Sequence, residues 1–368
     1  MLDELILSPI QEINVSRRVA FGVNAIERLT GIFEDLGIKR LHIFSGRTKT
    51  KEITEKLVIP QISGNIEFEY TPLPDKIDLS FLNKISGTID RYQTYLMAVG
   101  GGTVIDYVKL IANMSKTEYI AVPTNASHDG FSSPYINFLL RTQVDQYFKK
   151  ELSQEYCPIS PLAIVGDTTM ISKAPKESLK AGVGDILSKW VAVEDWKLAN
   201  RLKGEDYDIY AASFSEMTAT MVEERIHDLG KNFFGEKGVR ALIKALGSSG
   251  VAMCIAGSSR PASGSEHLVS HALDSLSFEY DFEVLHGHQT GISAILMMYL
   301  HGGDWIRIRK SLKKISAPLT LHDIGIDRDI MLLALQKAQH IRPERYTVLS
   351  EGLTRSAAEN AIEMTGID

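Results

Sequence analysis

Residues 95–110 read YLMAVGGGTVIDYVKL, and this stretch decides the fold prediction. A run of apolar residues that ends in glycine is typical of a parallel strand buried on both faces. The three glycines at residues 100–102 let the backbone approach a ligand closely. The residues after them have helical spacing, and a helix N-terminus presents free N–H groups to phosphate. The stretch therefore predicts a strand, a turn that binds a pyrophosphate, and a helix.

A tight turn that binds no ligand is the alternative to this interpretation. Asp106 would then lie in the first helical turn only because an acidic side chain stabilises the positive end of the helix. The three consecutive glycines also differ from the usual dinucleotide fingerprint with spaced glycines, and they follow the third predicted strand rather than the first. The strand before them and the helix after them favour cofactor binding.

Short apolar runs and helical stretches alternate on both sides of this turn. The expected strands are residues 41–46, 66–70, 95–102 and 119–124, and the helices between them include residues 24–37 and 103–115. Residues 136–166 are expected to add strand and hairpin structure. Alternation of this kind favours a doubly wound, Rossmann-like parallel sheet.

From about residue 185 the apolar residues recur at three- and four-residue spacing, as in helices with one buried face. The predicted fold class is therefore an α/β N-terminal domain with a Rossmann-like parallel sheet, followed by an all-helical C-terminal domain. Residues 1–170 would bind a dinucleotide, and residues 171–368 would bind a metal and the substrate.

A second polar segment, PTNASHDGFSSP at residues 123–134, follows the next predicted strand. Ligands of open α/β sheets bind beyond the carboxyl ends of the strands, so this segment and the glycine turn are expected to share a crevice. The hydroxyls of Thr124, Ser127 and Ser133 could bind phosphate, ribose or the nicotinamide amide. Such residues are also common in turns, but so long a run of them exceeds what a turn requires.

Three separate segments contain candidate metal ligands. They are KAGVGD (residues 180–185), SGSEHLVSH (263–271) and LHGHQ (285–289). Asp185 is expected at the start of a helix, His267 and His271 lie four residues apart on one helix face, and His286 and His288 follow. Oxygen and imidazole ligands suit zinc or a similar divalent ion. Asp185 could instead cap a helix, and each histidine could be a core or surface residue, so spacing alone does not name the ligands.

The bulk composition is that of an ordinary globular protein. The chain has 368 residues, 44% of them hydrophobic and 23% charged, with a formal net charge of −6. It has no block of like charges, which argues against a nucleic-acid partner. No apolar run approaches the ~18 residues of a membrane span, and the acidic N-terminus MLDELILSPI differs from a secretory signal. With two distant cysteines, Cys157 and Cys254, a cytoplasmic location is expected.

Five segments resemble the superfamily of iron-containing alcohol dehydrogenases, glycerol dehydrogenases and dehydroquinate synthases. They are VGGGTVIDYVK, PTNASHDGFSSP, KAGVGDILSK, SGSEHLVSHALD and IRPERYTVL, and the resemblance runs over nearly the whole chain. PTNASHDGFSSP and SGSEHLVSHALD point to the branch that acts on glycerol 1-phosphate. The resemblance implies a metal-dependent reduction of dihydroxyacetone phosphate to sn-glycerol 1-phosphate with NAD or NADP, as in the synthesis of archaeal-type ether phospholipids.

The resemblance also implies roles for individual residues. The cofactor pyrophosphate would be held by Gly102, Thr103, Val104, Ile105 and Asp106. The rest of the nicotinamide cofactor would contact Thr124, Asn125, Ala126, Ser127 and Ser133. One divalent metal, with zinc as the first choice, would bind Asp185, His267 and His286. The catalytic residues would be Asp129, Asp185 and His271, with Asp129 and His271 beside the substrate.

Two features depart from the pattern of this superfamily. Its His-Gly-Glu segment reads His286-Gly287-His288 here, so His288 could compete with His286 for the metal. Relatives that prefer NAD often carry an acidic residue after the first strand, whereas residues 45–51 (SGRTKTK) are basic and suit the 2′-phosphate of NADP. A cation is also expected at the substrate phosphate, and Arg260 is the candidate.

Three other functions remain open on the sequence alone. They are polyol oxidation of the glycerol dehydrogenase type, a lyase reaction like that of dehydroquinate synthase, and non-catalytic binding of a nucleotide or metal. The expected partners are a small-molecule substrate and further copies of the chain in a homo-oligomer, with no nucleic acid and no membrane-embedded segment.

Overall fold

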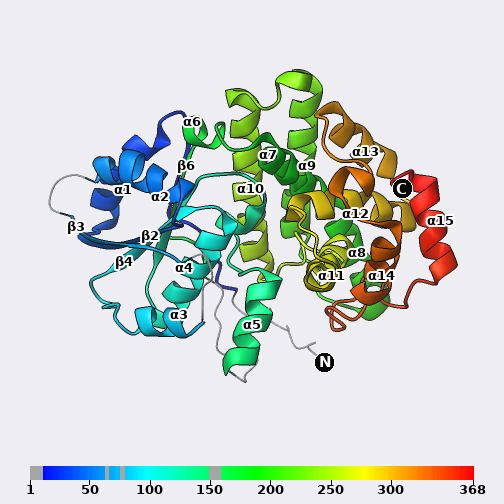
Figure 1. Ribbon diagram of the computed structural model, residues 1–368, viewed down its shortest axis with the longest axis horizontal. Coiled ribbons are helices and arrows are strands. Elements are labelled where there is room, and N and C mark those ends of the chain that lie inside the picture. The colour runs from blue at the N-terminus through cyan, green and yellow to red at the C-terminus, as the bar shows by residue number, and fades with distance from the viewer. Residues whose placement is uncertain (1–10, 63–65, 75–78, 149–158) are drawn as a thin grey trace, which may run out of the picture.

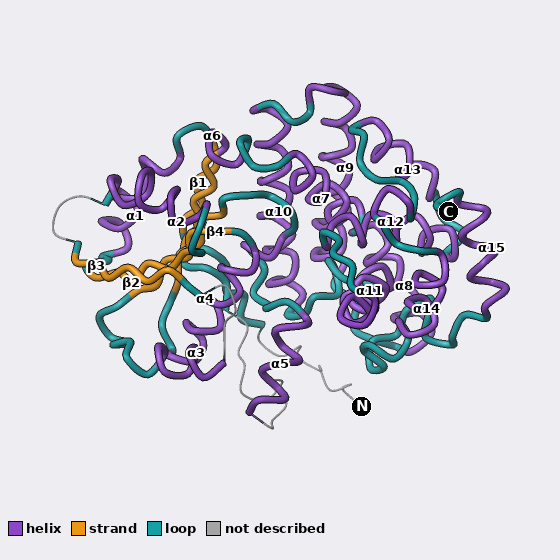
Figure 2. Tube along the Cα trace, in the orientation of Figure 1, coloured by secondary structure: helices purple, strands orange, loops and turns teal. Residues whose placement is uncertain are grey.

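Six parallel strands form one sheet in the computed structural model, which describes residues 11–62, 66–74, 79–148 and 159–368. Their order is β1-β6-β5-β4-β2-β3, and Figure 2 shows them in orange. Their bounds are β1 (Arg18–Gly22), β2 (Arg40–Ser45), β3 (Glu67–Pro72), β4 (Tyr95–Gly100), β5 (Tyr119–Pro123) and β6 (Ala163–Asp167). The four strands predicted around the glycine turn are confirmed as β2 to β5, with ends that differ by at most a few residues.

The edge strand β1 was not predicted from the sequence. Its residues RVAFG include Arg18 and Val19, which are exposed, so β1 lacks the continuous apolar run of a strand buried on both faces. The glycine turn therefore follows the fourth strand of the chain, and the prediction that it follows the third is wrong.

The strand order reverses between β2 and β4. From β2 the chain passes to β3 on one side and then returns to β4 on the other side. Ligands of doubly wound sheets bind beyond the carboxyl ends of the strands at such a point. The glycine turn follows β4 and the basic segment follows β2, and a Cβ on Gly46 would lie 3.8 Å from Val104 Cγ2. The sheet therefore brings the two segments to one crevice.

Six helices accompany the sheet in the first half of the chain. They are α1 (Leu29–Leu36), α2 (Lys49–Ile53), α3 (Leu79–Ser86), α4 (Gly102–Ser115), α5 (Phe138–Phe148) and α6 (Thr168–Ile171). The helices predicted at residues 24–37 and 103–115 are confirmed as α1, with the helical turn before it, and α4.

The prediction of strand and hairpin structure for residues 136–166 is wrong over α5. Leu140 and Val144 are buried in α5, and their spacing of four residues is that of a helix face. Only β6, at the end of this stretch, is a strand, and residues 149–158 lie outside the described part of the chain.

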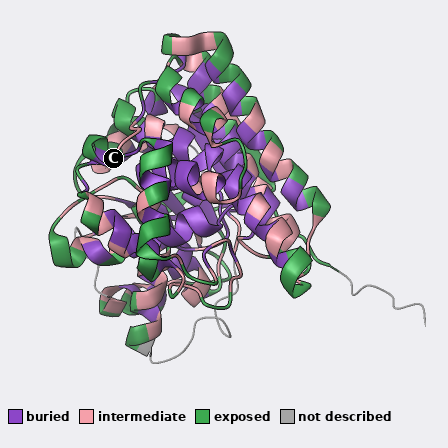
Figure 3. Ribbon diagram, turned by 90° about the vertical axis from the view of Figure 1, so that its right-hand side faces the viewer, coloured by how far each residue is buried: buried purple, intermediate pink, exposed green. Residues whose placement is uncertain are grey.

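After β6, every regular element of the described chain is helical. The longer helices are α7 (Lys176–Leu187), α8 (Lys189–Lys203), α9 (Ile209–Leu229), α10 (Glu236–Ala256), α11 (Ser265–Tyr280), α12 (His286–Leu300), α13 (Trp305–Lys314), α14 (Arg328–Ala338) and α15 (Arg355–Thr365). Figure 3 shows buried residues gathered inside this bundle and exposed residues on its outer helices. The predicted fold class is confirmed. One hydrophobic core runs through both halves, and the division into two domains at residue 170 stays a prediction.

Helix α10 stands between the sheet and the other helices (Figure 1). It packs against α9 and also contacts β1. Its length and composition would allow it to cross a membrane, a possibility that the sequence prediction overlooked. In the structure, however, 56% of its most apolar 18-residue stretch is buried inside the molecule. The apolar character of α10 is therefore that of a core helix.

Candidate active site

Three of the predicted metal ligands converge at the ends of three helices. Asp185 lies on α7, His267 on α11 and His286 on α12, and one ligand atom from each lies within 4.8 Å of the others. The Nε2 atoms of His267 and His286 are 3.5 and 4.0 Å from Asp185 Oδ1. One carboxylate and two imidazoles, with further positions open, form a donor set that fits a catalytic zinc or a similar divalent ion.

Neighbouring side chains hold both imidazoles in the orientation that metal binding requires. His267 Nδ1 is 2.6 Å from Glu266 Oε1. His286 Nδ1 is 3.0 Å from Ser270 Oγ, which itself donates to Gln289 Oε1 and so accepts from the ring. A proton on each Nδ1 leaves the lone pair of each Nε2 free, and partners of this kind commonly orient metal-binding histidines.

Glycines allow the helices that carry Asp185 and His286 to approach closely. A Cβ on Gly184 would overlap the carbonyl oxygen of Gly287, and a Cβ on Gly287 would overlap that of Ala181. The glycines of the KAGVGD segment are therefore packing residues. Asp185 lies in the last turn of α7, which begins after Pro175, so the expectation that Asp185 stands at a helix start is wrong.

We expect Gly184→Ala to lower both the free energy of unfolding and the affinity for divalent metal. The added methyl group would collide with backbone, which cannot rotate away, and overpacking of this kind costs about 1–3 kcal/mol. Gly31→Ala is the matched control, because Gly31 lies inside α1 with nothing within 4 Å of its Cβ position. It should stabilise the protein by roughly 0.5–1 kcal/mol. Denaturant unfolding and metal titration measure both effects, and equal effects of the two variants would contradict the packing argument.

A buried lysine links the metal ligands to the polar loop at residues 123–134. Lys189 Nζ lies 2.9 Å from Asp129 Oδ2 and 3.2 Å from Asp185 Oδ1, and its side chain is fully buried. Burial alone would lower the pKa of Lys189, but the two carboxylates raise it above its ordinary value. Burial would likewise raise the pKa of Asp185, whereas Lys189 and His267 lower it below its usual range. Lys189 and Asp185 therefore remain charged together.

Helix α10 packs directly against the polar loop at residues 123–134 and forms hydrogen bonds with it. Ser249 Oγ donates to Asp129 Oδ2 at 2.6 Å, and Ser132 Oγ lies 2.7 Å from the carbonyl oxygen of Leu246. A Cβ on Gly250 would overlap the Ser132 carbonyl, so the loop lies directly on the helix. These contacts fix the Asp129 carboxylate beside the metal ligands.

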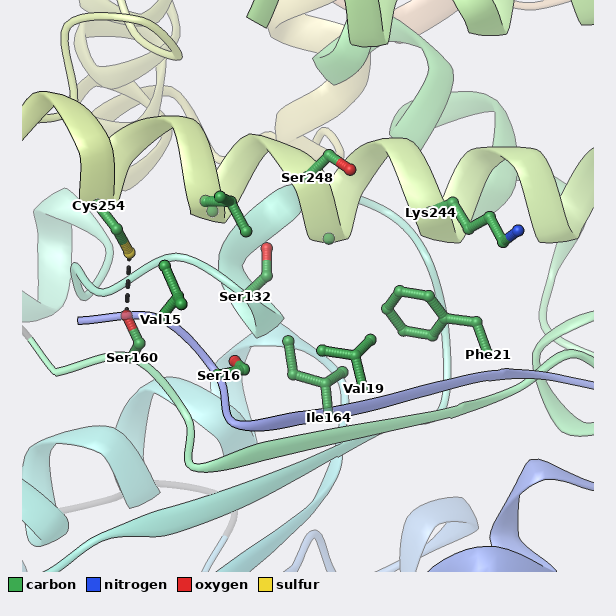
Figure 4. Close-up of a pocket in the computed structure, with 13 residues that line it drawn as sticks. Val15, Ser16, Val19, Phe21, Ser132, Ser160, Ile164, Lys244, Ser248 and Cys254 are labelled. Atoms are coloured by element: carbon green, nitrogen blue, oxygen red, sulfur yellow. Dashed lines mark hydrogen bonds between the residues drawn. The ribbon is translucent and has the colours of Figure 1, made fainter. Parts of the chain in front are cut away.

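A second cavity of about 320 Å³ lies on the other side of this loop, between β1 and α10 (Figure 4). Its walls are mainly apolar, and Ser160 and Cys254 form a hydrogen bond of 3.0 Å at one end. Ser132 lines this cavity. The candidate metal ligands His267 and His286 line a different cavity, into which the glycine turn also opens. The two cavities are therefore separate, with the loop and α10 between them.

One cavity of about 330 Å³ joins the glycine turn to the metal ligands. Among the predicted site residues it is lined by Gly102, Thr103, Asp106, Asp129, Ser133, His267, His271 and His286. Val104, Ile105, the segment 124–127 and Asp185 do not line it. The Asp106 carboxylate is already bonded to Lys109 and Asn137, so its side chain stabilises the loop while the start of α4 remains open.

His271 lines the same cavity as His267 and His286. Its ring stacks on Phe138, with 4.7 Å between ring centroids, and its buried Nδ1 has no hydrogen-bond partner among the described residues. Burial lowers the pKa of His271 to about 4, so the ring is neutral at pH 7.

The structure places two other candidate residues, His288 and Arg260, away from the positions that the sequence analysis considered for them. His288 Nε2 lies 3.8 Å from Glu177, and the structure places His286 rather than His288 in the cluster with Asp185 and His267. Arg260 donates to Glu205 and to the Tyr346 carbonyl and does not line the cavity. The expectation that Arg260 faces the substrate phosphate is therefore wrong, because its charge is already paired.

Three cavity-facing or buried residues escaped the sequence analysis: Lys189, His128 and Arg342. Lys189 lies on the buried face of α8, four residues after Asp185, and this spacing was the available signal. His128 Nδ1 accepts from the Gly130 N–H, and its ring fills the space that a Gly102 side chain would need. Arg342, from the IRPERYTVL segment, lines the cavity, and nothing in its local pattern marked it.

Known proteins are similar to this chain over nearly its whole length. Residues 20–175 match the sequence model of the iron-containing alcohol dehydrogenase family. The chain is 40% identical over 355 residues to a glycerol-1-phosphate dehydrogenase (NAD(P)+) from Caldivirga maquilingensis, which covers 96% of this chain and 97% of that protein. It is 42% identical over 359 residues to the protein of the same name from Pyrobaculum neutrophilum, with 98% and 99% covered.

The fold is similar to that of a solved structure at much lower identity. The crystal structure of glycerol dehydrogenase from Schizosaccharomyces pombe superposes with a TM-score of 0.75 at 19% identity and covers 97% of this chain and 91% of that one. This similarity supports the fold alone. The full-length similarity at about 40% identity is what shows the family: the chain belongs to the glycerol-1-phosphate dehydrogenases, oxidoreductases related to the iron-containing alcohol dehydrogenases.

Proposed function

We propose that this protein reduces dihydroxyacetone phosphate to sn-glycerol 1-phosphate, with NADH or NADPH as the reductant and one divalent metal, zinc as the first candidate, in the site. The observation that carries the proposal is the cavity that joins the glycine turn to His267 and His286, which cluster with Asp185. The names of the full-length relatives supply the substrate. The product would serve the synthesis of ether phospholipids.

The overall reaction consumes one hydride and one proton for each carbonyl reduced. When bound, the metal would supply a Lewis acid for the C2 carbonyl oxygen, and the reduced nicotinamide would supply the hydride for C2. Asp185, His267 and His286 would hold the metal ion. The residues of the chain would position the reactants in this cavity.

Asp129 and His271 are proposed to contact the substrate. Asp129 is held by Lys189 and Ser249, and as a carboxylate it can accept a hydrogen bond from a substrate hydroxyl. His271, neutral and stacked on Phe138, is the candidate to relay a proton to the C2 oxygen, with one ring nitrogen donating its proton while the other takes up a proton from water.

The cofactor is proposed to bind across the turn after β4. The start of α4 would face the pyrophosphate, from Gly102 to Asp106, while the segment from Thr124 to Ser127 and Ser133 would complete the site. The basic segment after β2 would face the adenosine ribose. Lys49 and Lys51 have acidic partners on the same helical segment, whereas Arg47 makes no ion pair with any described residue.

We therefore expect Arg47→Ala to raise the KM for NADPH by roughly tenfold and to leave the KM for NADH nearly unchanged, because only NADPH carries the 2′-phosphate that an arginine can bind. Lys51→Ala is the matched control, since Lys51 is 3.8 Å from Glu55. Steady-state kinetics with both cofactors provide the measurement. Equal changes for NADH and NADPH would refute the assignment of this segment.

The proposed function is tested by comparing turnover of glycerol 1-phosphate with that of free glycerol at equal concentration. A strong preference for the phosphorylated substrate supports the proposal, and equal rates would favour a glycerol dehydrogenase. Net formation of reduced cofactor would exclude a lyase like dehydroquinate synthase. A chiral assay of the product decides between the sn-1 and sn-3 phosphates.

We propose a cytoplasmic enzyme that assembles as a homo-oligomer and binds a small-molecule substrate, with no nucleic-acid partner. The N-terminal residues 1–10 and Cys157, which entered the prediction of a cytoplasmic location, lie outside the described residues.

A further inference from the structure

An unpaired arginine faces the cavity that holds the metal ligands. Arg342 lines this cavity together with His271 and Asp274, and its guanidinium forms no hydrogen bond or ion pair with any described residue. Arg260, nearby in the fold, is neutralised by Glu205, and Arg345 donates to Ser259 Oγ. Unlike these two arginines, Arg342 has a guanidinium that is free to bind an anion.

The surroundings of Arg342 connect it to the expected substrate position. Its guanidinium carbon lies 5.8 Å from the centroid of the Phe138 ring, and that ring stacks on His271 at 4.7 Å. Burial and the charge of Arg141 lower the pKa of Arg342. A partly buried cation next to a second cation is unfavourable until an anion binds beside it. The site is therefore prepared for a negatively charged group.

We propose that Arg342 binds the phosphate group of the substrate and so determines the preference for a phosphorylated triol over a free one. A guanidinium presents two parallel N–H donors that match a phosphate, and such charge-assisted pairs are strong and geometrically specific. The phosphate of glycerol 1-phosphate is only a few bonds from C2, so a substrate with C2 at the metal ligands must place its phosphate within the same cavity. This inference rests on the proposed function.

The test compares Arg342→Gln and Arg342→Lys with the wild-type enzyme. In the glutamine variant, we expect the ratio of kcat/KM for glycerol 1-phosphate to that for free glycerol to fall about 100-fold, as for loss of a charge-assisted bidentate contact. The lysine variant should recover part of this loss, because lysine restores the positive charge but not the two parallel N–H donors of the guanidinium. The metal content and the KM for NADPH should match the wild type, which separates this role from a structural one and from binding of the cofactor phosphates.

Arg141→Gln is the matched control, because Arg141 lies beside Arg342 but lines only the neighbouring cavity and is 4.0 Å from Asp145. It should keep the wild-type ratio. A loss in Arg141→Gln as large as that in Arg342→Gln, or an unchanged ratio in Arg342→Gln, would overturn the inference.

A binding measurement keeps this inference separate from the proposed function. In isothermal titration calorimetry, inorganic phosphate should bind the wild-type protein and bind Arg342→Gln at least tenfold more weakly. If the wild-type enzyme used glycerol and glycerol 1-phosphate equally well, the proposed function would fail, and loss of phosphate binding in the variant would still support an anion site at Arg342. Equal phosphate binding by both proteins would refute that site.

Discussion

Replacing His267 by alanine should remove the bound metal and lower kcat/KM by roughly three orders of magnitude. Loss of one of three protein ligands leaves too few donors for a divalent ion, and a metal acting as Lewis acid contributes several kcal/mol to transition-state stabilisation. His267 Nδ1 lies 2.6 Å from Glu266 Oε1, and a partner of this kind would orient the ring toward the metal. Metal analysis of the purified protein and steady-state kinetics provide the two measurements.

The control for this variant is His288→Ala. His288 is also buried and lies two residues from the ligand His286, but it is directed toward Glu177 and away from the cluster. It should retain a full complement of metal. If His288→Ala lost the metal as His267→Ala does, the ligand assignment would be wrong, and the family departure at His286-Gly287-His288 would mark a different coordination.

The parts of the site that could be predicted from the sequence are those with a local signal. The glycine turn follows a buried strand and opens a helix, so its place at the crevice follows from the general rule for parallel sheets. His267 lies on α11 directly after Glu266, which is also buried and contacts its ring. The position of His267 beside His286, however, comes from the packing of α11 on α12. The histidine pattern thus indicated a metal site, and the resemblance supplied the ligands.

The parts that escaped prediction depend on contacts between distant segments. Lys189 is an ordinary lysine in a helical stretch until the fold brings Asp129, sixty residues earlier, to 2.9 Å from it. Arg260 looked available because its partner, Glu205, is distant in sequence. The edge strand β1 is partly exposed, so it lacks the continuous apolar run of a strand buried on both faces. Charge pairing and edge exposure are tertiary properties, so local patterns do not report them.

Lys189→Met is expected to lower the free energy of unfolding of the metal-free protein by about 3–5 kcal/mol, because it leaves the buried carboxylates of Asp129 and Asp185 without their shared cation. Methionine preserves the length and apolar character of the lysine stem, so the loss would come from the charge. Excess divalent metal should restore part of the stability, since a bound cation would again compensate Asp185.

Lys197→Met provides the matched comparison, because Lys197 lies on the same helix and also contacts two carboxylates, Glu194 at 2.9 Å and Glu216 at 2.8 Å. Its side chain is 35% exposed, whereas that of Lys189 is fully buried. Solvent screens the exposed pairs, so this variant should lose no more than about 1 kcal/mol. Denaturant unfolding of both variants, with and without metal, measures the difference. A similar loss in the two would mean that the buried network contributes no more than a surface ion pair.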